Sequence, residues 1–183
     1  MRGAHFTREA LMSLYSTEIY NLKLLVDSPY FGKIVFKNDN DLNEMPIYIG
    51  KRSLIDGAEI LIYDWRSPIA SMYYNYSIGK AEYQKDNLKV TGKISSKRQI
   101  QIENGELLSV DEQDTLSDDK LLMKYLKDNA DSRLKSIVST IQKEQNGIIR
   151  SPLRNNYIVQ GVAGSGKTTV ALHRIAYLLY NEA

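Results

Sequence analysis

The sequence predicts an α+β fold with four parts: an N-terminal helix, a small antiparallel β-rich domain, a helical linker and a final strand–loop–helix unit. Three observations lead to this prediction. Apolar residues have helical spacing before position 27, β-branched and aromatic clusters alternate with turn residues from about 31 to 110, and a glycine-rich loop separates apolar stretches after position 155. We therefore place the domain boundaries at 1–27, 28–116, 117–150 and 151–183.

The composition excludes several classes of protein. The chain has 183 residues, which suits one ordinary domain or two small ones, and its net charge of +2 gives no overall attraction to nucleic acid or membranes. It has no cysteine and 2 histidines, which excludes disulfides, thiolate metal sites and a histidine cluster. No apolar run has the length of a signal peptide or a membrane span, so we expect a cytoplasmic protein.

The first helix is predicted from Thr7 to Val26, with Thr7 as its N-cap. Its apolar positions recur at spacings of three and four: Leu11, Leu14, Tyr15, Ile19, Leu22 and Leu25. We expect this apolar face to pack on a core. The alternative is that the helix is the stub of a longer coiled-coil arm.

Short β-type stretches follow from Phe31 to Val110. They read KIVF, PIYIG, EILIYDW, MYYNYSIG and KISSKRQIQI. Asn104-Gly105 and Asp56-Gly57 are two-residue hairpin signals, because such turns need positive φ. The pattern predicts a compact antiparallel sheet or small barrel of roughly 80 residues.

Two groups in this β-rich section are candidates for a special role. Trp65 is the only tryptophan, and we interpret it as a buried organiser of the domain, with Arg66 paired to Asp64 and Pro68 ending the strand. As candidate partner contacts we single out three tyrosines that we expect to be exposed, Tyr73, Tyr74 and Tyr76, together with the Lys97-Arg98 pair.

Helical patterns return after Ser117. Asp118 or Asp119 can cap a run that carries Leu121, Leu122, Tyr125 and Leu126. A second run extends from Asp131 to Ile149, and YIVQ at 157–160 is a candidate buried strand. The stretch TVALHRIAYLLY after it has the pattern of a helix.

The glycine-rich loop carries the clearest chemistry. Its residues fit G-x-x-x-x-G-K-[ST] between a predicted strand and a predicted helix: Gly161, Val162, Ala163, Gly164, Ser165, Gly166, Lys167 and Thr168, with Thr169 following. The glycines allow backbone N–H groups to surround phosphate oxygens at a helix N-terminus. Lys167 is suited to the β and γ phosphates of ATP, and the Thr168 hydroxyl to Mg²⁺.

A glutamine upstream extends the pattern. Gln145 lies 16 positions before Gly161, and alone it would be interpreted as a solvated helix residue. Gln145, the G-x-G-S-G-K-T loop and the H-R-I-A helix together resemble superfamily 1 helicases of the UvrD/Rep group. The resemblance implies a RecA-like P-loop domain in which Gln145 reads adenine through its paired amide donor and acceptor.

The resemblance becomes more selective when other segments are added. SPYFGKI, YIGKRSLID, YDWRSPIASMYYNY, KRQIQIENGEL and IVSTIQKEQNGIIR, with the loop and its helix, resemble the helicase-D (HelD) branch from about Ser28 to Tyr180. Proteins of that branch are bacterial ATPases that bind RNA polymerase and release it from nucleic acid. The resemblance therefore implies ATP, Mg²⁺, DNA and RNA polymerase as ligands and partners, and helicase or ATP hydrolase activity for the parent protein.

One segment imitates a second motor motif. Val110 to Asp114 reads VDEQD, like a Walker B motif, but it precedes the phosphate loop, whereas a Walker B strand follows it. We interpret it as an acidic, solvated turn. No Walker B pair, arginine finger or second RecA-like domain follows Ala183, so we expect a truncated motor that has no catalytic residues and is inactive in hydrolysis alone.

One strand and one helix cannot build the parallel sheet on which a phosphate loop normally lies. We therefore expect the chain after Asn155 to be mobile, refolded against the β-rich body, or paired with another copy. The leading hypothesis is the N-terminal fragment of an ATP-dependent helicase-like motor. The alternative is a non-catalytic protein-binding module with a vestigial phosphate loop, and a small-molecule kinase is disfavoured because the loop lies so late in the chain.

Overall fold

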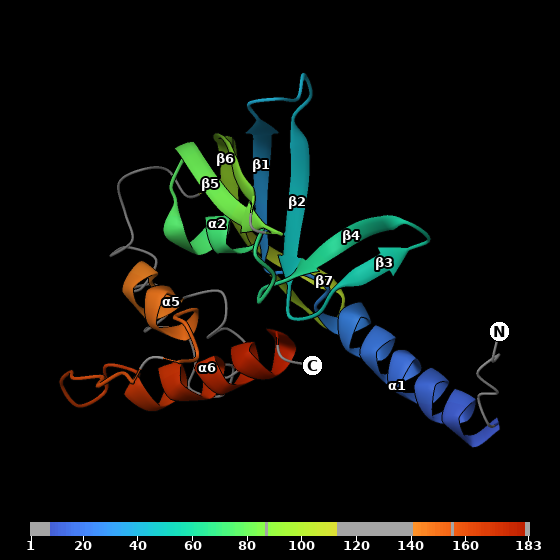
Figure 1. Cartoon of the computed structure of the whole chain (residues 1–183). Coiled ribbons are helices and arrows are strands. Elements are labelled where there is room, and N and C mark those ends of the chain that lie inside the picture. Colours follow the sequence, from blue (N-terminus) through green and yellow to red (C-terminus); the bar gives the residue numbers. More distant parts are fainter. Residues whose placement is uncertain (1–7, 87, 113–140, 155, 182–183) are drawn as a thin grey trace, which may run out of the picture.

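A computed structural model describes residues 8–86, 88–112, 141–154 and 156–181 of the chain. Its centre is one seven-stranded sheet, and four helices lie around it among the described residues (Figure 1). The strands are β1 (Gly32–Asn38), β2 (Met45–Gly50), β3 (Leu54–Asp56), β4 (Glu59–Asp64), β5 (Gly79–Lys85), β6 (Leu88–Glu103) and β7 (Glu106–Glu112). The helices are α1 (Arg8–Asp27), α2 (Ser71–Asn75), α5 (Lys143–Ile149) and α6 (Lys167–Asn181).

The sheet is organised around the long strand β6. Its order is β3-β4-β2-β1-β6-β5, and β7 also pairs with β6. β6 has 16 residues, so one of its halves pairs with β5 and the other with β7. The predicted antiparallel sheet is confirmed for these pairs, but β2 and β4 run parallel, with Ile49 opposite Tyr63. The parallel pair was not predicted, because β3 lies between β2 and β4 in the sequence and the turn signals indicate only the pairing of β3 with β4.

The hairpin turns follow the local sequence. Asn104 and Gly105 have φ of 52° and 76°, as the predicted turn between β6 and β7 requires. The second predicted hairpin joins β3 to β4, and there Gly57 takes the positive φ of 60°. A third tight turn, which the sequence analysis missed, joins β5 to β6 and gives Asp86 a φ of 48°.

The stretch MYYNYSIG is not a strand, contrary to the prediction. Residues Ser71–Asn75 form α2, and hydrogen bonds from Ser71 N–H to Pro68 O and from Met72 N–H to Ile69 O begin the turn ahead of it. Tyr73 and Tyr74 are 2% and 7% exposed, so the expectation that they form an exposed partner surface is also wrong. Tertiary packing overrides the β preference of tyrosine here, because a short helix buries three consecutive residues over the sheet.

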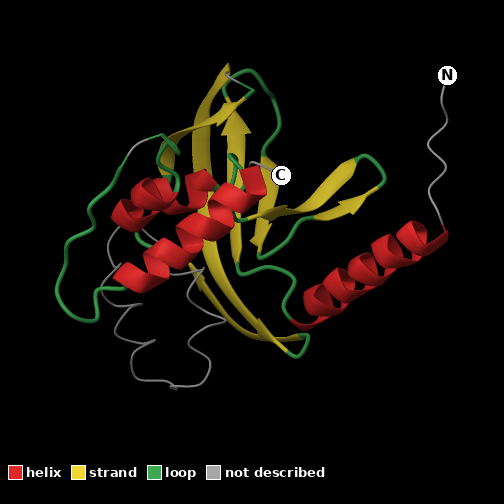
Figure 2. Ribbon diagram, turned by 60° about the horizontal axis from the view of Figure 1, so that its bottom comes forward, coloured by secondary structure: helices red, strands yellow, loops and turns green. Residues whose placement is uncertain are grey.

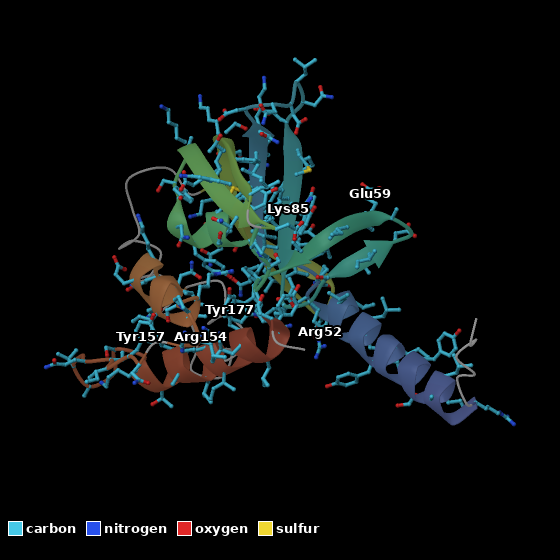
Figure 3. The ribbon with its side chains drawn as sticks, in the orientation of Figure 1. Arg52, Glu59, Lys85, Arg154, Tyr157 and Tyr177 are labelled. Carbon is cyan, nitrogen blue, oxygen red and sulfur yellow. The ribbon has the colours of Figure 1, made fainter. Side chains whose placement is uncertain are left out.

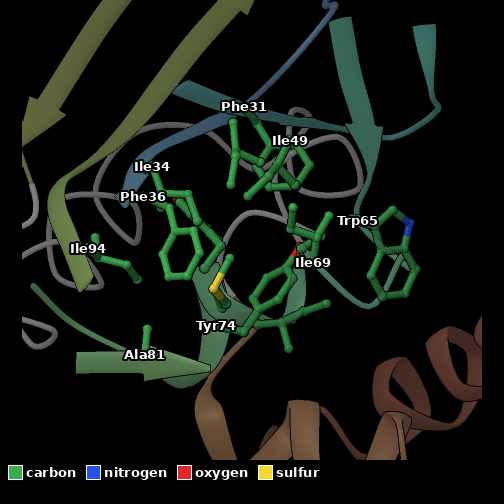
Figure 4. Close-up of a cluster of buried hydrophobic side chains, with 14 of the residues drawn as sticks. Phe31, Ile34, Phe36, Ile49, Trp65, Ile69, Tyr74, Ala81 and Ile94 are labelled. Carbon is green, nitrogen blue, oxygen red and sulfur yellow. The ribbon is translucent and has the colours of Figure 1, made fainter. Parts of the chain in front are cut away.

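One face of the sheet and α2 enclose the hydrophobic core (Figure 4). The core residues of the strands alternate along them, as expected for a sheet with one covered face: Ile34, Phe36, Ile47, Ile49, Ala81 and Ile94. Trp65 follows β4 and is 5% exposed, which confirms its predicted role as a buried organiser. Helix α5 packs beside α2, and α6 packs beside α5; the helices lie on the same side of the sheet (Figure 2).

The N-terminal helix α1 extends away from the sheet (Figure 1). It ends at Asp27, one residue after the predicted end at Val26, and the predicted N-cap Thr7 lies outside the described residues. Its apolar face does not pack on a core. Tyr15, Ile19 and Leu22 are 61%, 53% and 45% exposed, and only Leu25 is buried among the helix side chains that the structure describes. Its base is fixed by the β6–β7 turn, where the N–H of Asn104 donates to Asp27 Oδ1 at 2.7 Å.

Two predictions made after β6 also need comment. Val110 to Glu112 belong to β7, so this part of the VDEQD segment is a strand and not a turn. The helical run expected at 118–126 lies outside the described residues. Of the run expected from Asp131 to Ile149, the described part is helical only over Lys143–Ile149.

We expect Gly92→Ala to destabilise the sheet. A Cβ at Gly92 would lie 2.2 Å from the Lys37 carbonyl oxygen and 2.6 Å from Phe36 Cζ, so backbone would have to move. The expected loss in the free energy of unfolding is roughly 3 kcal/mol or more, measured by urea denaturation. Gly147→Ala is the matched control: its Cβ meets nothing within 4 Å, and helix propensity predicts a gain of up to about 1 kcal/mol. Equal stability of the two variants would contradict the packing described here.

Candidate nucleotide-binding site

The predicted phosphate loop lies directly before α6, as expected. Gly164 and Gly166 have φ of 82° and 80°, which is a conformation that favours glycine. The Ser165 N–H donates to Val162 O at 3.2 Å, and Val170 N–H donates to Gly166 O at 2.9 Å as the helix begins. The loop therefore curls ahead of a helix N-terminus, which is the arrangement that presents N–H groups to an anion.

Lys167 lies across this loop. Its Nζ donates to the carbonyl oxygens of Gly161 at 2.9 Å and of Val162 at 2.8 Å. The ammonium is therefore held at the loop and not extended into solvent. A Cβ on Gly161 would lie 2.6 Å from Ser165 Oγ, so the two residues approach closely across the loop.

The other loop residues have distinct environments. Val162 is 78% exposed at the tip of the loop, and Ala163 and Thr168 are also exposed. Thr169 is half-buried, and its carbonyl oxygen lies 2.7 Å from His173 Nδ1. Thr168 is thus the hydroxyl in the first turn of α6 that remains open to a ligand or to Mg²⁺.

Gln145 lies against the loop. It is half-buried at the third position of α5, and its Oε1 accepts a hydrogen bond from the Gln142 N–H at 3.2 Å. Its Nε2 lies 3.5 Å from the position that a Cβ on Gly166 would occupy. The structure thus brings the glutamine and the glycine-rich loop together, although the sequence separates them.

The strand expected at YIVQ is absent. Residues 156–160 have no regular secondary structure, and Ile158 is 98% exposed. A parallel strand needs partners on its edges and cover on both faces, and neither is available to it among the described residues. Of the predicted strand–loop–helix unit, only the loop and the helix are therefore present. Among the three outcomes expected after Asn155, the structure shows the second, because α6 packs against the β-rich domain.

The loop helix is tied to the sheet domain through Arg150, which follows α5. Its guanidinium donates to the carbonyl oxygens of Trp65, Arg66 and Ser67. Its Nε also donates to Asn146 Oδ1 at 2.9 Å, and its plane stacks over the Tyr177 ring of α6 at 5.2 Å. Burial lowers the pKa of Arg150, opposed chiefly by Tyr177, yet a guanidinium stays charged in proteins.

Asp64 and Arg66 shape the segment that Arg150 binds. Arg66 Nε and Nη2 donate to the Asp64 carboxylate at 2.8 and 2.6 Å, which confirms the predicted pairing. This hydrogen bond raises the pKa of Arg66. The guanidinium of Arg66 in turn stacks over the Tyr180 ring at 4.5 Å, so α6 is held at a second point.

Arg174 completes the connection from the α6 side. Its Nη1 donates to the carbonyl oxygens of Ile148 and Ser151 at 2.9 Å each, which occupies carbonyls at the end of α5. The neighbouring His173 ring meets Trp65 edge-on at 5.4 Å. Figure 3 labels Tyr157 and, on α6, Tyr177, which are the aromatic partners of Arg174 and Arg150.

Sequence reasoning did not identify Arg150 and Arg174 as organising residues. Each directly follows a residue that faces the body: Arg150 follows buried Ile149, and Arg174 follows His173. An arginine at the border of an apolar helix face is the signal that was available, because such a side chain reaches inward to carbonyl groups. We name the contacts of Arg66, Arg150 and Arg174 with α5, α6 and residues 64–67 the arginine interface.

We expect Arg150→Ala to weaken this interface. The change leaves three carbonyl oxygens without their donor, so the free energy of unfolding should fall by roughly 2–3 kcal/mol. Arg150→Lys should recover little, because one ammonium cannot reproduce the planar fork. Urea unfolding followed by the fluorescence of Trp65 measures the loss, and the exposed Arg154→Ala is the control. A loss no larger than that of the control would show that the interface is not stabilising.

The comparisons with known proteins agree with the sequence motifs of the sheet domain. A family model described as "DNA helicase IV HelD, N-terminal domain" matches residues 1–131, which include the whole sheet but not the phosphate loop. No curated protein matches the chain significantly. None of the described helices has both the length and the apolar character of a membrane span. Since the family model covers most of the sequence, the chain belongs to the family of the N-terminal domain of DNA helicase IV HelD.

Proposed function

We propose that this chain holds ATP and Mg²⁺ for a UvrD/Rep-like, HelD-type motor that acts on nucleic acid or removes it from RNA polymerase. The observation that carries the proposal is the position of Gln145 against a glycine loop at the N-terminus of α6. The family of the chain agrees with it, because the family description names a DNA helicase. A cytoplasmic location fits the same proposal.

The residues at the loop fit a nucleotide. Positive φ at Gly164 and Gly166 directs the backbone as a phosphate nest does, and Lys167 can exchange its two carbonyl partners for phosphate oxygens. Thr168 would coordinate Mg²⁺, and Gln145 would meet the adenine edge. Bound Mg·ATP would supply the free energy for motion in the motor, whereas this chain's residues bind and orient the nucleotide.

The arginine interface can couple nucleotide binding at the loop to the sheet domain. When phosphate replaces the carbonyl partners of Lys167, the loop before α6 loses the two hydrogen bonds that this side chain gives it. Because α6 is held by Arg66, Arg150 and Arg174, its displacement acts directly on residues 64–67. We propose that the sheet domain senses the nucleotide in this way.

Helix α1 fits the stub of a longer coiled-coil arm, which is the alternative that its sequence left open. Its exposed residues Met12, Tyr15, Ile19, Leu22 and Val26 follow a spacing of three and four, which is that of a coiled-coil seam. We propose that this seam pairs with another helix in the working protein and that the arm contacts RNA polymerase.

The second candidate is a protein-binding module with a vestigial loop. The observation that favours it is the lack of a strand at 156–160, which leaves the loop without the support of a parallel sheet. Nucleotide binding separates the two candidates, because a vestigial loop has no measurable affinity.

We expect the chain to bind a fluorescent ATP analogue with Mg²⁺ at roughly micromolar Kd, and Lys167→Ala to weaken binding at least about tenfold. The reason is the loss of the one ammonium that the structure places at the loop. Fluorescence anisotropy measures both affinities, with exposed Lys85→Ala as the control. Absence of binding by the unaltered chain, or equal binding by Lys167→Ala, would overturn the proposed function.

We expect Gln145→Glu to remove the preference for ATP over GTP. Glutamate keeps an oxygen for the Gln142 N–H but lacks the amide donor that adenine recognition needs. The ratio of the ATP affinity to the GTP affinity should fall roughly tenfold. The affinity for inorganic pyrophosphate, which has no base, should stay the same. An unchanged ratio would remove Gln145 from the nucleotide site and leave the phosphate loop intact.

A further inference from the structure

Three lysines form a continuous row on the face of the sheet opposite the core. Lys37 of β1 lies opposite Lys93 of β6, and Lys93 lies opposite Lys80 of β5. All three are exposed, and their neighbours Phe36, Ile94 and Ala81 point to the core. Because adjacent strands are about 4.8 Å apart, the row places three positive charges side by side across three strands.

This row is electrostatically unfavourable in the free protein, because like charges directly opposite each other destabilise a sheet. Two carboxylates on the same face are already bonded elsewhere: Asp39 accepts from Thr91 Oγ1 at 2.6 Å, and Glu82 pairs with Lys89 at 2.8 Å. Glu44 precedes Met45, the partner of Phe36, and so lies on the β2 side of Lys37. Among the residues that the structure describes, no carboxylate lies within salt-bridge distance of the three lysines. The three lysines therefore carry positive charge that no ion pair of the described residues takes up, although the whole chain is nearly neutral.

A second positive position lies further along β1 on the same face. Lys33 lies opposite Arg98, whose charge is taken by Glu112 at 2.8 Å. Lys33 itself lies over the Tyr48 ring at 5.0 Å, and the Tyr30 ring lies 4.9 Å from that of Tyr48. Two tyrosine rings thus border the charged face at its β2 side.

The chemistry of this face selects its partner. Between the lysine row and Lys33 it carries Val35 and the serines of β6, without a large apolar side chain. The cores of protein interfaces are depleted in lysine and enriched in aromatic and other large apolar residues, so a protein partner fits poorly. A polyanion fits well, because lysines that follow a backbone and aromatic rings at the border are the features of single-strand binding surfaces.

We infer that the row Lys37, Lys93 and Lys80 binds the phosphodiester backbone of single-stranded nucleic acid laid across β1, β6 and β5. The inference deepens the proposed function, on which it rests for the class of partner, by assigning a nucleic-acid contact to the sheet domain itself. It does not require the nucleotide site. The two can therefore fail separately.

The test is the salt dependence of binding to fluorescein-labelled oligo(dT), measured with the full chain in the absence of nucleotide. Each neutralised phosphate contributes about 0.7 to the slope of log K against log salt for a single strand. The variant with Lys37→Gln, Lys80→Gln and Lys93→Gln should therefore lose about 2 from this slope and bind more weakly at low salt. Its Lys167-dependent binding of the ATP analogue should be unchanged.

The matched control removes the same charge elsewhere, with Lys23→Gln, Arg52→Gln and Arg154→Gln; Figure 3 labels the last two positions. This control should keep the slope of the unaltered chain. Urea denaturation verifies folding, and the triple lysine variant should be at least as stable as the unaltered chain because a repulsion is removed. Equal slopes for the two variants would overturn the inference. It would also be overturned if the three lysines were needed for binding of polyglutamate but not for binding of oligo(dT).

Discussion

The guanidinium of Arg150 lies where three segments far apart in the sequence meet, and the position of the glycine-rich loop depends on it. Three backbone carbonyls at 65–67 point to it, and Tyr177 of α6 covers it. Without strong donors there, the carbonyl groups would be left poorly satisfied in a half-buried position. The interaction thus stabilises the turn after β4 and at the same time fixes α5, which carries Gln145, beside α6, which follows the loop.

This arrangement explains how the glycine-rich loop keeps its shape without a parallel sheet of its own. In place of strands, the supports of α6 are buried Val170, the edge contact of His173 with Trp65, and the arginine interface. The sheet of the β-rich domain serves as the rigid body to which the loop helix is attached. The opposite face of the sheet does not support the loop helix, and on that face the lysine row is exposed to solvent.

The sequence allowed the local features to be predicted, and tertiary contacts decided the rest. Asn104 and Gly105 are predictable because positive φ at both positions is a local requirement. The helix at Ser71–Asn75 was missed because burial of Tyr73 and Tyr74 overrides their strand preference. The strand at 156–160 was wrongly predicted because an apolar run forms a buried strand only where partner strands exist. The exposure of the apolar face of α1 could not be predicted from the helical periodicity alone. At the candidate site, the glycine-rich loop and Gln145 were predicted from their spacing. Arg150 and Arg174 were missed because their partners are backbone carbonyls, and the only sequence signal was an arginine at the border of an apolar helix face.

The central claim is that α6 and the sheet form one cooperative unit joined by the arginine interface. Native-state hydrogen exchange of the backbone amides tests it most directly, because it reports the opening free energy of each element separately. The account predicts that the α6 amides near Val170 and Arg174 exchange with nearly the same free energy as those of β1 and β6. Rapid exchange throughout α6 while the sheet stays protected would contradict the account, because the loop helix would then open independently of the domain that holds it.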